Sequence, residues 1–192
     1  FINVNNIIID LEIRDLNIYN VLASIAILKK LEIDIYKIKA KLKNFESPEG
    51  RGKKYSIMRY KKKFNLIDES YNSNPLSLKS AILNYDKINS KKSKKYLLLG
   101  DMLELGNHSK KLHQSIIPII NQTKVDKVFV KGSKVTSIFN QLTKSKKGRI
   151  LQNKSQIINL LRDDLNNDDY LMIKASNATG FNRIVKDLKG LN

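Results

Sequence analysis

The sequence predicts an α/β fold in which helices cover a mostly parallel, Rossmann-like sheet, with a helical segment before it. After residue 52, short apolar runs alternate with helical patterns of about 10 to 15 residues, as in parallel βαβ units. Before residue 46, two helical patterns follow each other. Between these parts lies Ser47 to Gly52, a segment rich in turn formers and free of large apolar residues. We therefore expect two domains, residues 1–46 and residues 47–192.

The N-terminal part has apolar residues at helical spacing from Asn17 to Lys30 and again from Ile33 to Phe45. Asn17 and Asn20 stand at the start of the first helix. Their amides serve either as helix caps, which need no ligand, or as partners for the edge of an adenine ring. On the pattern alone, the cap is the simpler interpretation.

The C-terminal part has six apolar runs that predict strands, of which the first two are close enough to form a hairpin: residues 55–60, 64–67, 96–99, 127–130, 149–151 and 170–173. Helical patterns lie near residues 75–88, 109–121, 135–142, 155–165 and 180–188. Asn74 before Pro75 predicts a capped helix start with proline at the first helical position.

Polar loops follow three of these strands: Asp68 to Pro75, Gly100 to Gly106, and Lys174 to Asn177. Ligands of parallel α/β sheets bind beyond the carboxyl ends of the strands. We therefore expect the three loops to meet on one edge of the sheet and to form one binding site.

Asp68 and Glu69 are placed to accept hydrogen bonds from the hydroxyls of a ribose. The alternative is an acid at a helix start, but Asp68 lies too far upstream of Pro75 for that role, so we favour a ligand. Arg51 stands between two glycines, where a guanidinium can offer paired donors to phosphate. A solvated linker arginine is the simpler interpretation of that pattern.

The chain is strongly basic, with 36 Lys and Arg, 18 Asp and Glu, and a net charge of +18. Three lysine-rich runs, residues 61–63, 91–95 and 144–147, are candidate nucleic-acid contacts. The chain is equally crowded with Asn and Ile, as an AT-rich coding sequence produces, and these runs fall where turns are expected. We favour solvated turns, whose field attracts small anionic substrates.

Other features exclude further classes of protein. There is no cysteine, which fits a reducing compartment, and the histidines His108 and His113 are too few and poorly spaced for a zinc site. No run approaches the roughly 18 apolar residues of a membrane span, and no P-loop pattern is present. The chain begins without Met or a basic leader, so we expect a fragment or a trimmed chain.

Taken in order, the polar loops resemble motifs of the Mur ligase family, and within it of the branch that adds D-alanyl-D-alanine. Leu66 to Pro75 resembles the signature LIDDSYNANP, and Leu99 to Gly106, with His113 seven residues on, resembles LGDMLELG…H. Three weaker likenesses are Asn17 to Ala26 with HNVxNxLAAIA, Phe45 to Gly52 with F-x-x-P-x-GR, and Met172 to Ser176 with VLVKGS.

The resemblance implies a three-domain protein: a UDP-sugar-binding domain, a central ATPase and a C-terminal Rossmann-like domain. Residues 1–46 would be the tail of the truncated central domain, and residues 47–192 the third domain. The implied reaction uses ATP to form an acyl phosphate on the carboxylate of UDP-N-acetylmuramoyl-tripeptide, which the amine of D-alanyl-D-alanine then attacks. The family also implies a cytoplasmic, monomeric enzyme of peptidoglycan synthesis that binds small molecules and no nucleic acid.

By this resemblance, one group of residues would bind ATP: Asn17, Arg51, Asp68, Glu69 and Tyr71. A second group would face the D-alanyl-D-alanine: Ser73, Asn74, Asp101, Lys174 and Ser176. We expect no catalytic residue within the chain, because the P-loop and the Mg²⁺ ligands belong to the missing front portion. The fragment alone is therefore not expected to catalyse ligation.

Three positions depart from the family pattern. Leu16 stands where a His is usual, Ala175 replaces a Gly, and Glu69 replaces the second Asp, which is expected to shift the ribose contact toward Asp68. Two alternatives remain open: another Mur-type or folylpolyglutamate-type ligase, and a basic, non-enzymatic α/β module that binds nucleic acid. Against the second, aromatic residues make up only 7% of the chain and are not interleaved with the basic runs.

Overall fold

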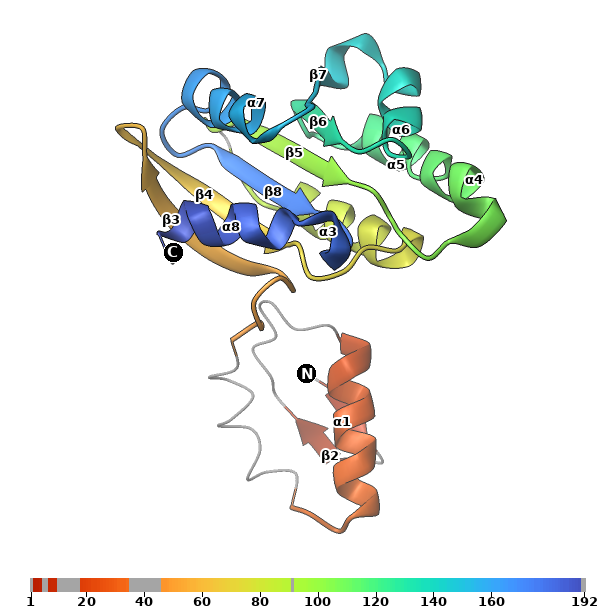
Figure 1. Ribbon diagram of the computed structural model, residues 1–192. Helices are drawn as coiled ribbons and strands as arrows, with labels where there is room; N and C mark the ends of the chain where they lie inside the picture. The colour runs from red at the N-terminus through yellow and green to blue at the C-terminus, as the bar shows by residue number, and fades with distance from the viewer. Residues whose placement is uncertain (1, 5–6, 10–17, 35–45, 91, 191–192) are drawn as a thin grey trace. The chain divides into compact units, whose positions relative to one another are not determined.

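The computed structural model describes residues 2–4, 7–9, 18–34, 46–90 and 92–190 (Figure 1). The chain divides into two compact units, Phe1–Pro48 and Glu49–Asn192. None of the described helices is long and apolar enough to cross a membrane.

Unit 1 contains a short antiparallel pair of strands, β1 (Ile2–Val4) and β2 (Ile7–Ile9), and one helix, α1 (Ile18–Lys30). The helix confirms the first helical pattern, whereas the strand pair was not expected, because runs of three residues show no periodicity. Most of the second helical pattern, residues 35–45, lies outside the described residues, as does Asn17. Asn20 is exposed in the first turn of α1.

Unit 2 is built on a six-stranded sheet of order β3-β4-β8-β5-β6-β7. The strands are β3 (Lys53–Arg59), β4 (Lys62–Glu69), β5 (Lys95–Gly100), β6 (Lys127–Lys131), β7 (Lys147–Ile150) and β8 (Tyr170–Lys174). β3 and β4 form the expected antiparallel hairpin, and every other neighbouring pair is parallel. The predicted α/β fold with a mostly parallel sheet is therefore confirmed.

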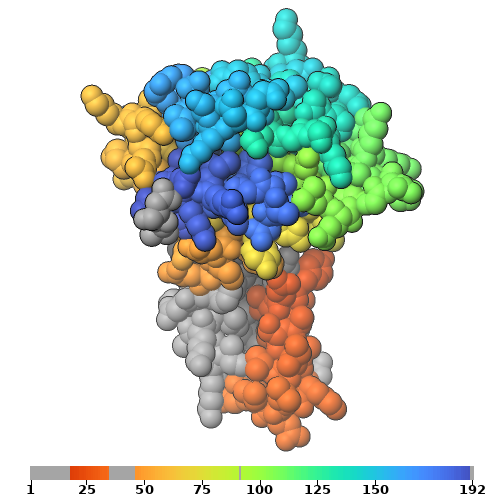
Figure 2. Space-filling view, in the orientation of Figure 1, coloured from red at the N-terminus to blue at the C-terminus, as the bar shows by residue number. Residues whose placement is uncertain are grey.

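Helices cover both faces of this sheet (Figure 1). One face packs on α3 (Pro75–Asp86), α5 (Ile117–Gln122) and α6 (Thr136–Gln141), through buried residues such as Ile82, Ile120 and Ile138. The other face packs on α7 (Lys154–Asn159) and α8 (Phe181–Lys189), where Phe181 and Val185 are buried. In the space-filling view, the dark blue residues of the C-terminal segment lie together beneath the lighter blue residues that include α7 (Figure 2).

Two predicted helices are divided in the structure. The pattern over residues 109–121 becomes α4 (Ser109–Gln114) and α5, because Pro118 lacks the N–H that would bond to the carbonyl of Gln114. The pattern over residues 155–165 becomes α7 followed by a π-helical turn, Leu160–Asp164.

The connections explain why the candidate site forms at one place. The chain runs from β4 through α3 to β5, then outward to β6 and β7, and returns through α7 to insert β8 between β4 and β5. The direction of strand progression therefore changes beside β8. In open α/β sheets the loops diverge at such a reversal, and ligands bind beyond the carboxyl ends of the strands there.

Candidate functional site

Three parallel strands end side by side at this reversal. Glu69 at the end of β4 pairs with Lys174 at the end of β8, and Leu99 near the end of β5 pairs with the same residue. The loops that follow these strands therefore leave the sheet at one edge, as predicted. Asp68, Asp101 and Ser176 all belong to this edge.

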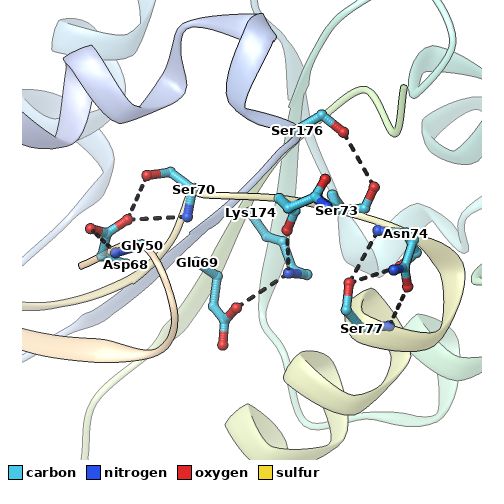
Figure 3. Close-up of polar contacts among 10 residues, drawn as sticks. Gly50, Asp68, Glu69, Ser70, Ser73, Asn74, Ser77, Lys174 and Ser176 are labelled. Carbon is cyan, nitrogen blue, oxygen red and sulfur yellow. Dashed lines mark hydrogen bonds and ion pairs between the residues drawn. The ribbon is translucent and has the colours of Figure 1, made fainter. Parts of the chain in front are cut away.

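Lys174, the last residue of β8, lies at the middle of this edge and bonds to the end of β4 and to the loop that follows β4 (Figure 3). Its side chain is 2% exposed, and Nζ donates to Glu69 Oε2 at 3.2 Å and to the Asn72 carbonyl at 2.9 Å. Burial lowers the pKa of the Lys174 ammonium; the Glu69 carboxylate raises it, and the positive charge of Arg51 lowers it further. Because Glu69 offsets only part of the cost of burying the charged Lys174 ammonium, an anion bound beside Lys174 and Arg51 would be stabilised.

Ser176, in the loop after β8, connects this loop to two others. Its hydroxyl donates to the Ser73 carbonyl at 3.2 Å and accepts from the Leu103 backbone N–H at 2.9 Å. Its own backbone N–H donates to the Asp101 carbonyl at 3.2 Å. Ser176 therefore bonds to both the loop after β4 and the loop after β5.

Asp68 is buried and holds the turn that precedes β3 (Figure 3). Its Oδ2 accepts from the Gly50 N–H at 2.9 Å, and its Oδ1 accepts from the Ser70 N–H at 3.1 Å and the Ser70 hydroxyl at 2.6 Å. Gly50 has φ +73°, and a Cβ there would meet the Tyr71 Cβ at 2.7 Å, so only glycine fits. The carboxylate is thus occupied by the protein itself, which leaves Glu69 as the more accessible acid.

Arg51 follows this turn and stacks on Tyr71. The guanidinium carbon lies 4.2 Å from the centre of the tyrosine ring, and both side chains are exposed. Stacking of this kind restricts the guanidinium without using its N–H donors, which stay available for an anion. The Tyr71 N–H donates to the Gly50 carbonyl at 3.1 Å, so the turn and the stack are bonded to each other.

Asp101 and His113 fix the loop after β5. Asp101 Oδ1 accepts from the N–H groups of Lys134 and Val135, at 3.0 and 2.7 Å, and so joins this loop to the start of α6. His113 is fully buried; Nε2 accepts from the Met102 N–H at 3.0 Å, and Nδ1 lies 2.7 Å from the Ser109 carbonyl. These partners require a neutral imidazole with its proton on Nδ1.

Ser73 and Asn74 lie where α3 begins. Asn74 caps the helix as predicted, in a reciprocal capping box. The Asn74 Oδ1 accepts from the Ser77 N–H at 2.8 Å, and the Ser77 hydroxyl accepts from the Asn74 N–H at 3.1 Å. Ser73 is 2% exposed, and among the described buried side-chain oxygens and nitrogens its Oγ has no hydrogen-bond partner. An unpartnered buried hydroxyl at this edge fits a ligand that would accept or donate a hydrogen bond.

Most residues at this edge could be predicted from the sequence, but the hydrogen bonds that connect them could not. Ser70, Asn72 and His113 were not assigned to the site, although the first two lie inside the LIDDSYNANP-like segment, which was the available signal. Asn20 lies in unit 1, whereas the residues of this edge belong to unit 2. Among the described residues, no three His, Asp or Glu side chains are grouped so that they could hold a metal ion.

Comparison with known proteins identifies the family. The family model described as Mur ligase, glutamate ligase domain, matches residues 56–177, which include the three strands and their loops. The chain belongs to the Mur ligase family. Within the Mur ligase domain, the matched segment ends at Asn177, just after the Ser176 that joins the loops.

Two relatives of this Mur ligase chain are named as ligases of the same kind. The UDP-N-acetylmuramoyl-tripeptide–D-alanyl-D-alanine ligase of Buchnera aphidicola subsp. Acyrthosiphon pisum is 33% identical over 177 residues, which is 90% of this chain and 36% of that protein. The ligase of the same name from Bacillus subtilis is 29% identical over 140 residues, 71% of this chain and 30% of the relative. The chain thus spans about a third of the length of these relatives.

The crystal structure of the MurF ligase of Thermotoga maritima in complex with ADP has the same fold. It superposes with a TM-score of 0.71 at 22% identity and covers 90% of this chain and 37% of that chain.

We predict that Asp68→Ala destabilises unit 2 by about 3 kcal/mol, because three buried donors lose a charged acceptor. Urea unfolding of the 192-residue chain measures the effect, and hydrogen exchange at the amides of Gly50 and Ser70 localises it. The control, Asp163→Ala, removes an exposed carboxylate that pairs with its neighbour Arg162 and should leave the unfolding free energy nearly unchanged. Equal stability of the two variants would show that Asp68 does not hold the turn.

Proposed function

We propose that this chain is the C-terminal part of an ATP-dependent amide ligase that adds D-alanyl-D-alanine to UDP-N-acetylmuramoyl-tripeptide in peptidoglycan synthesis. The observation that carries the proposal is the edge where Lys174 and Ser176 join three loops beside Arg51. The names of the two Mur ligase relatives supply the substrates. Because the chain spans about a third of their length, the complete reaction requires the rest of the protein.

In the proposed reaction, a carboxylate oxygen of the tripeptide attacks the γ-phosphorus of ATP, and ADP leaves. The amine of D-alanyl-D-alanine then attacks the acyl carbon; the carbon–oxygen bond to phosphate breaks, phosphate leaves with the electron pair, and the nitrogen loses a proton. Negative charge develops on the phosphoryl oxygens and on the oxygen of the tetrahedral carbon. Cations and N–H donors that are already in position lower the barrier to both steps.

On the nucleotide side, Arg51 would bind the phosphates, since its stack on Tyr71 orients the guanidinium while leaving the donors available. Glu69 would accept from the ribose hydroxyls, because the Asp68 carboxylate is buried and already accepts three hydrogen bonds. This revises the expectation that the ribose contact shifts to Asp68. Asn17 remains the proposed adenine contact.

On the dipeptide side, the Lys174 ammonium and the unpartnered Ser73 hydroxyl suit the carboxylate of D-alanyl-D-alanine. Ser176, Asn74 and Asp101 would act mainly by shaping the pocket, since each already bonds to the backbone of a neighbouring segment. The net positive charge of the chain would attract the two anionic substrates, ATP and UDP-N-acetylmuramoyl-tripeptide.

The proposed reaction also needs Mg²⁺ and a P-loop. When bound, Mg²⁺ neutralises charge on the phosphates of ATP, and we place its ligands and the P-loop in parts of the protein outside this chain. We also propose that the protein works in the cytoplasm as a monomer. A different amino-acid-adding or folylpolyglutamate-type ligase is less favoured, because both relatives carry the D-alanyl-D-alanine name.

In the full-length protein, Arg51→Ala should lower kcat/KM for ATP by about 100-fold with the fold intact, because a paired phosphate contact is lost. Coupled ADP release with the tripeptide and dipeptide substrates measures it, and Arg51→Lys should restore part of the activity. The matched control is Arg183→Ala, an exposed arginine on α8. Unchanged ATP use by the Arg51→Ala enzyme would remove Arg51 from the nucleotide site.

Whether Glu69 or Asp68 contacts the ribose can be tested with 2′-deoxy-ATP. The wild-type enzyme should prefer ATP by roughly tenfold, the size of one hydrogen bond to a charged group. Glu69→Ala should abolish this preference, whereas Asp68→Asn should retain it even if the protein is less stable. The opposite pattern would return the ribose contact to Asp68.

A further inference from the structure

A concave surface lies on the opposite edge of the sheet, at the amino-terminal ends of β5 and β6. Here a cavity of about 820 Å³ is bounded by the end of α3, the connection from α3 to β5, and the turn before β6. This volume is within the range of small-molecule sites in proteins. Five lysines line it: Lys87, Lys92, Lys94, Lys95 and Lys124.

The acidic residues of the cavity do not neutralise these lysines. Two carboxylates, Asp86 and Asp126, also line it, so the lining carries a formal charge of +3. Asp86 Oδ1 accepts from the Lys124 backbone N–H at 2.6 Å, and Asp126 Oδ2 accepts from the Lys95 backbone N–H at 2.7 Å. The carboxylates of both aspartates therefore bind backbone N–H groups of the lysines.

Lys95 is the buried lysine of the cavity lining. It is 2% exposed, and its Nζ donates to the Asp86 carbonyl at 2.7 Å, the one acceptor that this ammonium has among the described residues. An ammonium has three N–H donors, so two remain available. Burial lowers the pKa of Lys95; Asp86 raises it, Lys124 lowers it and Asp126 raises it. A buried cation with spare donors is the feature that distinguishes this cavity from a solvated lysine-rich turn.

The other four lysines of the lining are exposed. Within the part of the chain that the structure describes, the side chains of Lys87, Lys92, Lys94 and Lys124 make no hydrogen bond or ion pair. Like charges gathered over one concave surface repel one another and concentrate the field in the cavity. An anion bound there would relieve the repulsion and accept the unused donors.

We propose that this cavity binds a small anion that carries adjacent phosphate groups, of the diphosphate class. Lysines bind phosphate as point charges from flexible stems, which suits several closely spaced oxyanions, and a diphosphate carries enough charge to match the excess of +3. The lining contains no aromatic side chain on which the bases of a single-stranded nucleic acid would stack. The proposal is independent of the ligase reaction, which uses the other edge of the sheet.

Titration of the 192-residue chain with inorganic diphosphate tests the proposal, by isothermal calorimetry at about 0.15 M salt, where distant charges are screened. We expect saturable binding to one site, with NMR shifts of the Ser93 and Lys124 amides. Lys124→Gln should weaken binding roughly tenfold, as expected for one charge-assisted hydrogen bond. Lys144→Gln is the matched control: it removes the same charge from another exposed lysine, in the run at residues 144–147, and should leave the Kd unchanged.

Three results would overturn the proposal. The first is no saturable diphosphate binding. The second is equal weakening by Lys124→Gln and Lys144→Gln, which would show a diffuse attraction to the basic surface. The third is tighter binding of a single-stranded oligonucleotide that displaces diphosphate and is weakened by Lys124→Gln, which would assign the surface to nucleic acid. Circular dichroism of each variant verifies that the fold is retained.

Discussion

The candidate site depends on the register of three parallel strands. β8 lies between β4 and β5, and its last residue, Lys174, pairs with the ends of both. Because the strands end at one level, Lys174 and Ser176 can bond to the loops on either side of them. A shift of β8 by one residue would turn these side chains to the opposite faces of the sheet and separate the loops.

Much of this arrangement could be predicted from the sequence. The alternation of short apolar runs with helical patterns predicted all six strands of unit 2, and Asn74-Pro75 predicted the start of α3. The insertion of β8 between β4 and β5 could not be predicted, because periodicity says nothing of which strands are neighbours. For the same reason the partner of Asp68 was missed: Gly50 is 18 positions away, and only the folded hairpin brings it close.

The two acids at the end of β4 show how packing separates similar residues. Asp68 and Glu69 are adjacent in sequence, and their side chains point to opposite faces of the strand. Asp68 is buried against the turn at Gly50, whereas Glu69 reaches Lys174 and remains partly exposed. The lysines differ in the same way. Most contribute to a diffuse positive field, but Lys174 and Lys95 are buried at opposite edges of the sheet and have defined acceptors.

Hydrogen exchange at the Leu103 amide in a Ser176→Ala variant is the decisive measurement for this arrangement. If Ser176 joins the loops, removal of its hydroxyl leaves the Leu103 N–H without its acceptor, and exchange should become about tenfold faster. Ser115→Ala, which removes an exposed hydroxyl that donates to the Leu112 carbonyl, should leave exchange at Leu103 unchanged. Exchange at Leu103 that is the same in the wild type and in Ser176→Ala would contradict the account of a site held together at the end of β8.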